Sequence, residues 1–233
     1  MNSAPLLFCG LFAAFALSWW GVIAAPRFQL AGATTVMPKA TRVAYPPNRP
    51  GLAQQGAELF RSEGCYTCHS QMVRPEGLGP DLARGWGARR SVGRDYLRDN
   101  PAMLGNVRIG PDLRNFGSRS GAGDTNLAPA LVRFHLLHLY HPHTVMPKSV
   151  MPAYPYLFET RPVRGAGSPD ALLLPAAFAP PAGFEVVPRP EAHALVAYLF
   201  SLAHDVSLPE VPVLLPPEEE GAESPAEPEA PAN

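Results

Sequence analysis

The sequence predicts a mainly α-helical chain, in which a single N-terminal transmembrane helix is followed by a small domain with long Pro/Gly-rich loops. Three observations support this fold class. Residues 5–25 contain no charged side chain. Residues 51–63 and 191–204 place apolar side chains at helical spacing. The 29 prolines and 20 glycines among 233 residues exclude regular structure from much of the rest.

The uncharged run at residues 5–25 is long enough to span a membrane. A helix of these 21 residues measures about 30 Å, the thickness of a bilayer's hydrocarbon core. Trp19 and Trp20 fall near its end, where aromatic side chains favour the interface. A cleaved signal peptide with its site at residues 31–33 is the alternative, but no basic segment precedes the run. We therefore expect residues 1–27 to be a retained anchor.

The most specific pattern is Cys-Tyr-Thr-Cys-His at residues 65–69. Two cysteines three positions apart and an adjacent histidine are typical of covalent haem attachment. Cys65 and Cys68 would form thioethers with the haem vinyl groups, and His69 would bind the iron. The third cysteine, Cys9, lies in the apolar run, so no second pair completes a zinc site. A redox Cys-x-x-Cys is the weaker reading, and we expect one haem c.

The rest of the chain divides into three regions. Residues 28–50 contain several prolines and little periodicity, which predicts an extended tether. Residues 51–206 hold the haem motif and the periodic segments, including a helix expected at 128–140, and should form the cytochrome c domain. Residues 207–233 are an acidic Pro/Glu/Ala tail with too few apolar residues to fold, so we expect disorder.

The helices expected at 51–63 and 191–204 resemble the pair that crosses over the haem in small c-type cytochromes. The first groups five apolar residues towards one side: Leu52, Ala53, Ala57, Leu59 and Phe60. The resemblance predicts a crossing contact between one residue of each helix, Leu59 or Phe60 with Leu195, Tyr198 or Leu199.

A second axial ligand must come from another part of the chain. Methionine sulfur there raises the reduction potential, which suits electron transfer. Met146 and Met151 each precede a proline in the loop before the last helix, and the residues alone leave both open. The partner of the His69 imidazole is equally open, because Gly-Pro-Asp-Leu occurs twice and offers Pro80 or Pro111.

Four histidines lie close together in the sequence: His135, His138, His141 and His143. They raise the alternatives of a zinc or copper site, or of a bis-histidine haem. No carboxylate or thiolate accompanies them at metal-ligand spacing. We expect them to be structural or to line the haem edge.

Charge is unevenly distributed along the chain. All 19 Lys and Arg lie within residues 27–189, whereas seven of the 20 acidic residues lie from Glu210 onward. The basic body is compatible with an acidic docking partner. No basic run interleaved with aromatic residues is present, so we expect no nucleic-acid partner.

The chain resembles the mono-haem, membrane-anchored cytochrome c subunit (subunit II) of cbb3-type cytochrome c oxidases. The resemblance covers the anchor and residues 56–159. It rests on three blocks: GCYTCHSQMVRP at 64–75, IGPDLRNFGSR at 109–119 and FHLLHLYHPHTVMPKSVMPAYPYL at 134–157.

This resemblance implies roles for individual residues. Cys65 and Cys68 become the haem attachment points, with His69 as the proximal ligand. Met151 becomes the distal ligand and Pro111 the partner of His69, while His135 and His138 match family positions. His141 and Met146 stand where the family has other residues, which leaves Met146 as the alternative distal ligand.

The resemblance also implies a function. The chain would be a non-catalytic one-electron carrier, receiving electrons from a second cytochrome c subunit and passing them to a polytopic haem–copper oxidase catalytic subunit. A carrier of another respiratory complex and a haem enzyme with a labile sixth ligand are the alternatives. We expect a bacterial inner membrane location with the haem domain on the periplasmic side. Thioether attachment resembles an export-side process, although four basic residues after the span favour the opposite orientation.

Overall fold

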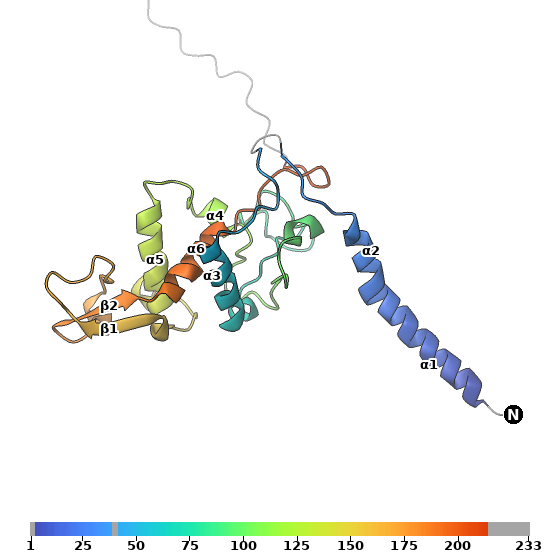
Figure 1. The fold of residues 1–233 in the computed structure, drawn as a ribbon, viewed down its shortest axis with the longest axis horizontal. Helices are drawn as coiled ribbons and strands as arrows, with labels where there is room; N and C mark the ends of the chain where they lie inside the picture. Colours follow the sequence, from blue (N-terminus) through green and yellow to red (C-terminus); the bar gives the residue numbers. More distant parts are fainter. Residues whose placement is uncertain (1–2, 39–41, 214–233) are drawn as a thin grey trace, which may run out of the picture.

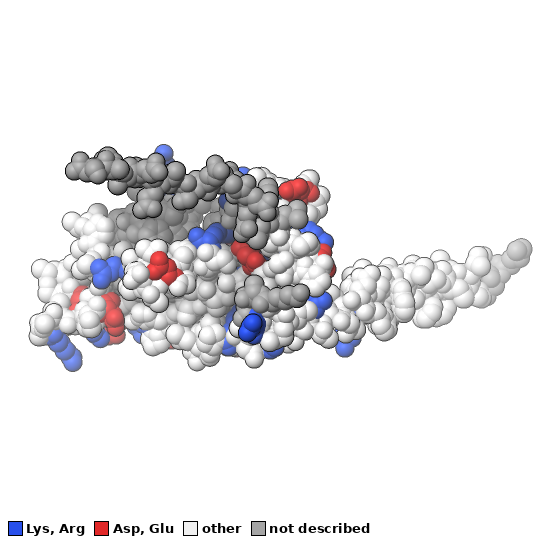
Figure 2. Space-filling model, turned by 90° about the horizontal axis from the view of Figure 1, so that it is seen from above, with Lys and Arg blue, Asp and Glu red and all other residues white. Residues whose placement is uncertain are grey.

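The computed structural model describes residues 3–38 and 42–213 of the chain. Its N-terminal part is one long helix made of α1 (Ala4–Trp19), a π-helical turn (Trp20–Ala24) and α2 (Ala25–Ala31), which projects away from the domain (Figure 1). This helix is long and apolar enough to cross a membrane. Its visible face in Figure 2 is free of charged side chains over most of its length.

The helix ends at Ala31, four residues beyond the anchor boundary expected at residue 27. Proline normally ends a helix because it lacks an N–H donor. Pro26 lies directly after the π-helical turn, a local change of hydrogen bonding that accommodates a residue without an N–H donor inside a long helix. The helix therefore continues through the first residues of the expected tether.

The domain is built around the crossing of α3 (Gly51–Ser62) and α6 (Pro190–Ser201). A Cβ atom on Gly56 would lie 1.9 Å from the carbonyl oxygen of Ala194, so only glycine permits this approach. Beside it, the rings of Phe60 and Tyr198 have centroids 5.4 Å apart. The predicted crossing contact is confirmed, whereas Leu52 is 47% exposed and lies outside it.

Two further helices complete the domain, α4 (Phe116–Arg119) and α5 (Ala128–Tyr140), and α5 has the bounds that the sequence predicts. Loops and short 3-10 turns connect the helices. The turns are Cys65–Thr67, Gly93–Tyr96, Pro142–Thr144, Pro155–Leu157 and Ala176–Phe178. The mainly α-helical class with one anchor and long loops is confirmed.

A small antiparallel sheet of β1 (Phe158–Pro162) and β2 (Phe184–Pro188) lies beside the helices (Figure 1). No regular structure is predicted for these residues from the sequence. Val186 is 1% exposed and joins the core. The hairpin therefore extends the apolar core at the start of α6.

The end of the domain differs from the expected boundaries. Helix α6 stops at Ser201 instead of residue 204, because Leu202 is fully buried and its carbonyl accepts a hydrogen bond from Gly117 N at 2.8 Å. Within the segment expected to be a tail from residue 207, Leu208 is 2% exposed and bridges Val211. Residues 214–233 lie outside the described residues.

Candidate functional site

The two cysteines of the motif lie on the 3-10 turn that follows α3. Cys65 and Cys68 are free thiols with intermediate burial. Burial, and then the charge of Glu63, raises the pKa of Cys65 to about 11, so this thiol is protonated at neutral pH. Both thiols are thus positioned together and are not joined in a disulfide.

His69 is oriented by the backbone of a distant loop. Its Nδ1 atom lies 2.9 Å from the carbonyl oxygen of Pro111. A carbonyl only accepts hydrogen bonds, so Nδ1 carries the proton and Nε2 keeps its lone pair for a metal. Burial lowers the pKa of His69, although the bond to Pro111 opposes this, and the ring is neutral.

The other Gly-Pro-Asp-Leu segment, which contains Pro80, has a different role. Its Asp81 is fully buried and forms ion pairs with Arg74 at 2.9 Å and Arg108 at 2.6 Å. It is Pro111, and not Pro80, whose carbonyl meets His69.

Gly110 brings the loop into contact with the imidazole. A Cβ atom at this position would lie 2.2 Å from Cε1 of His69, so a side chain would displace the ring. Two backbone hydrogen bonds hold the loop close to the imidazole. Gly110 N donates to Cys68 O at 3.0 Å, and Leu113 N donates to Ser70 O at 2.8 Å.

Asp112 supports the same loop and was not identified from the sequence. Its carboxylate is fully buried and accepts hydrogen bonds from the Ser70 hydroxyl at 2.6 Å and from the backbone of Met72 at 2.7 Å and Arg114 at 2.9 Å. The signal was present in the repeated Gly-Pro-Asp-Leu motif, whose aspartate is buried in both copies. Asp112 thus connects the residues after His69 to the residues after Pro111.

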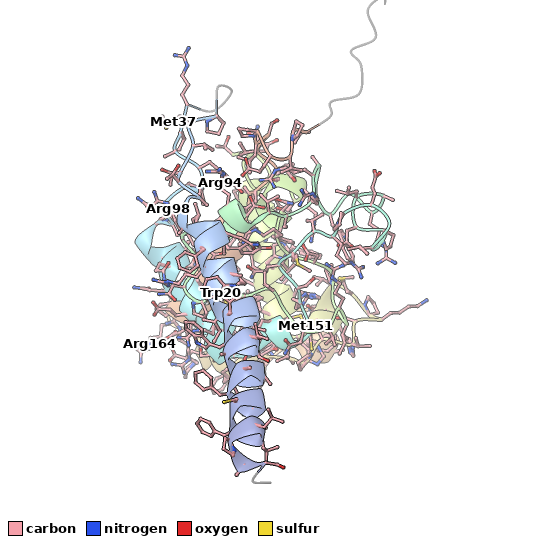
Figure 3. All side chains as sticks on the ribbon, turned by 90° about the vertical axis from the view of Figure 1, so that its right-hand side faces the viewer. Trp20, Met37, Arg94, Arg98, Met151 and Arg164 are labelled. Atoms are coloured by element: carbon pink, nitrogen blue, oxygen red, sulfur yellow. The ribbon has the colours of Figure 1, made fainter. Side chains whose placement is uncertain are left out.

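The two candidate distal methionines have different surroundings. Met151 is half-buried and packs against the main core, as does Cys65, whereas Met146 is 50% exposed. The Met151 loop is fixed by a hydrogen bond from Tyr154 N to Leu139 O of 3.0 Å. Burial, followed by the nearby cysteines, raises the pKa of Tyr154 to about 12. Figure 3 shows Met151 within the domain, away from Arg94 and Arg98.

The histidines of α5 face the interior. His135 contacts the rings of Phe116 and Phe200, and burial, followed by His138, lowers its pKa to about 4. Burial and then the neighbouring His69 lower the pKa of His138, whose buried Nδ1 atom has no hydrogen-bond partner. Among residues 3–38 and 42–213, no three His, Cys, Asp or Glu side chains form a metal-binding group.

This set of donors fits a haem. It contains two free thiols, one imidazole with a free Nε2 and a half-buried thioether. Nδ1 of His138 has no hydrogen-bond partner among residues 3–38 and 42–213, which leaves it available to a polar group of a bound cofactor.

Comparison with known proteins agrees with this chemistry. The family model described as "Cytochrome C oxidase, mono-heme subunit/FixO" matches residues 11–167, more than half of the chain. The match spans most of the anchor, the haem motif and the Met151 loop. No curated protein matched the chain.

Proposed function

This chain belongs to the FixO family of mono-haem cytochrome c oxidase subunits, and from this premise we propose that it carries single electrons to the catalytic subunit of a cbb3-type oxidase. The observation that carries the proposal is the hydrogen bond between His69 and Pro111. It leaves Nε2 of the imidazole free beside two thiols. The family membership makes the chain an oxidase subunit with one haem and confirms the resemblance found in the sequence.

We assign the haem to the following residues. Cys65 and Cys68 would attach it covalently, and His69 and Met151 would hold its iron. The packing of Met151 against the core supports this choice over the exposed Met146. When bound, the haem supplies a one-electron couple whose potential is raised by a methionine ligand.

The protein contributes the orientation of the His69 imidazole. Pro111 keeps the proton on Nδ1 of His69, Gly110 allows the loop to lie against the ring, and Asp112 fixes that loop to Ser70. With ligands on both sides, the iron would offer no open position to a substrate. The chain therefore makes and breaks no substrate bond in this proposal.

The proposed partners are a polytopic haem–copper subunit, which accepts the electrons, and a second cytochrome c subunit, which donates them. The N-terminal helix is the membrane anchor, and we place the haem domain on the periplasmic side. Protease protection in vesicles tests this orientation, since a cytoplasmic domain would contradict it.

Co-purification from membranes tests the proposal as a whole. The full chain should copurify with a many-span protein that contains b-type haem and copper, and should keep its haem colour on a denaturing gel. Cys65→Ala and Cys68→Ala together should abolish that colour. A wild-type chain that loses its haem on denaturation would disprove covalent attachment, and copurification with an unrelated complex would disprove the assigned partner.

A further inference from the structure

Residues 32–38 and 42–50, which we call the strap, lie between the anchor and α3. A free chain of this length could reach about 60 Å when extended, so it could let the domain swing. The strap instead doubles back on itself. Val36 and Tyr45 form an antiparallel bridge, with N–O distances of 3.0 and 2.7 Å. At Val36 and Tyr45 the chain therefore differs from the extended tether expected for residues 28–50.

Tyr45 inserts its side chain into the domain and is 2% exposed. Its hydroxyl donates to Asp95 Oδ1 at 2.6 Å and accepts from Arg89 at 3.2 Å. Nδ1 of His204, from the segment after α6, lies 3.0 Å from the same hydroxyl. One side chain of the strap thus contacts two distant parts of the domain.

The partners of Tyr45 are themselves a buried ion pair. Arg89 binds Asp95 with both ends of its guanidinium, at 2.7 and 3.0 Å, and the two side chains are 2% and 1% exposed. A buried pair of this kind is rigid and is strongly disrupted when one partner is removed. The ion pair therefore holds the Tyr45 hydroxyl in a fixed position.

Further contacts hold the strap along its length. Arg49 pairs with Asp99 at 2.5 Å, and Nε of Arg98 donates to the carbonyl of Pro46 at 2.8 Å. Nearer the anchor, Arg94 donates a hydrogen bond to the carbonyl of Thr34. Leu30 packs closely on Gly93, since a Cβ atom added to Gly93 would lie 2.5 Å from Cδ2 of Leu30. Figure 3 shows Arg94 and Arg98 together at one end of the domain.

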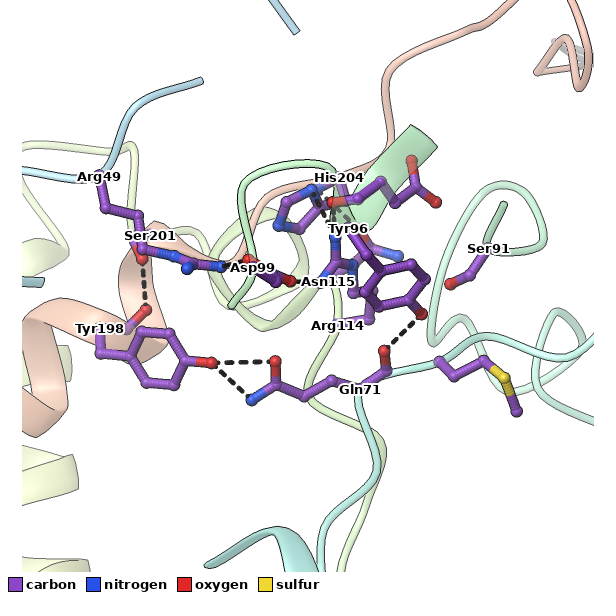
Figure 4. Close-up of polar contacts among 12 residues, drawn as sticks. Arg49, Gln71, Ser91, Tyr96, Asp99, Arg114, Asn115, Tyr198, Ser201 and His204 are labelled. Atoms are coloured by element: carbon purple, nitrogen blue, oxygen red, sulfur yellow. Dashed lines mark hydrogen bonds and ion pairs between the residues drawn. The ribbon is translucent and has the colours of Figure 1, made fainter. Parts of the chain in front are cut away.

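Apart from the contact of Tyr45 with His204, these contacts of the strap involve residues 89–99 of the domain. We call five side chains of that stretch the clamp: Arg89, Arg94, Asp95, Arg98 and Asp99. Figure 4 shows Asp99 of the clamp beside Arg114, which lies on the segment that follows Pro111. Arg114 binds Asp99 at 2.9 Å, and Asn115 Oδ1 accepts from His204 N at 2.8 Å. Arg114 and Asn115 lie three and four residues after Pro111.

We propose that the clamp holds the haem-bearing domain in one orientation relative to the membrane anchor, with Tyr45 as the main positioning residue. The strap then makes the connection between the anchor and the domain rigid. This inference goes beyond the proposed function, because it concerns the position of the domain whatever its electron partners are.

Distance measurements between two spin labels test the inference in the full chain, reconstituted in lipid nanodiscs. Gadolinium labels would be placed at Gln29→Cys in the anchor and Glu191→Cys at the start of α6, both exposed positions, in a Cys9→Ser background. We expect one narrow distance distribution. Tyr45→Phe, which keeps the ring and removes the hydroxyl, should broaden it at least about twofold, and so should Arg94→Gln combined with Arg98→Gln.

Tyr156→Phe is the matched control, because its hydroxyl bonds Glu63 outside the clamp. It should leave the distribution unchanged, and an unchanged haem spectrum in each variant shows that the domain is folded. A broad distance distribution in the parent protein would overturn the inference. An unchanged distance distribution in both Tyr45→Phe and the Arg94→Gln, Arg98→Gln double variant would also overturn it. Failure of haem attachment would be seen separately, as extra labelling of Cys65 and Cys68.

Discussion

Nδ1 of His69 and the carbonyl oxygen of Pro111 lie 2.9 Å apart, although 42 residues separate them in the chain. The contact fixes which imidazole nitrogen is free and in which direction it points. The buried carboxylate of Asp112 stabilises this contact, because it accepts a hydrogen bond from the Ser70 hydroxyl at 2.6 Å. The orientation of the His69 imidazole is therefore set by two backbone segments that are held together.

Gly110→Ala should disturb the proximal ligand. The new Cβ would meet Cε1 of His69 at 2.2 Å, so the ring or the loop must move. We expect weaker haem retention under mild denaturant and an altered ferric absorption spectrum. Gly123→Ala is the control, because no atom lies within 4 Å of its added Cβ. If both variants have the parent spectrum, the close approach at Gly110 has no influence on the ligand.

Met151→Leu should remove the distal ligand, whereas Met146→Leu should leave it in place. Leucine keeps the apolar volume and removes the sulfur. We expect Met151→Leu to abolish the sulfur-to-iron band and to lower the reduction potential by a sizeable part of the range of about 0.8 V that axial ligands span. Absorption spectroscopy and redox titration measure the two effects. The reverse pattern would assign Met146 as the ligand.

Gly56→Ala should destabilise the crossing of α3 and α6. The added methyl group would overlap the Ala194 carbonyl, at 1.9 Å, and overpacking of this kind costs about 1–3 kcal/mol or more. Chemical unfolding followed through the haem spectrum measures the free energy of unfolding. Gly51→Ala, at the open end of α3, has space for its methyl group and should have little effect. Equal stability of both variants would show that the helices can separate without cost.

Asp81 should make the domain sensitive to acid. Although burial raises the pKa of this carboxyl, hydrogen bonds from Arg74 and Arg108 bring it from 3.8 down to about 2. A carboxyl with a lowered folded-state pKa stabilises the protein above its unfolded value, and this contribution is lost as the pH falls through the folded value. Stability should therefore decrease between about pH 4 and pH 2.

The comparison with Asp81→Asn isolates this contribution. The amide cannot titrate, so the variant should be less stable than the parent near neutral pH, and the difference should shrink below about pH 4. Unfolding in denaturant at several pH values measures it. A difference that stays constant down to pH 2 would contradict the role of the Asp81 carboxylate.

Much of the fold could be predicted because its signals are local. The anchor is a continuous uncharged run, and α3, α5 and α6 follow from the spacing of their apolar residues. The β1–β2 hairpin could not be predicted, because its ten residues include two prolines and charged side chains and are ordered by packing on α6. The end of α6 was misplaced because Leu202 is buried in a non-helical conformation against Gly117.

The sequence by itself determined that this chain has a membrane anchor, the Cys65–Cys68–His69 motif and two methionines that compete as the second ligand, because each is a feature of neighbouring residues. Only the tertiary structure decided that Pro111 meets His69, that Asp112 fastens this loop and that Tyr45 docks the strap beside Asp95. The physical reason is that these contacts join residues 40 or more positions apart. Such contacts depend on the packing of the whole domain and leave no periodicity in the sequence.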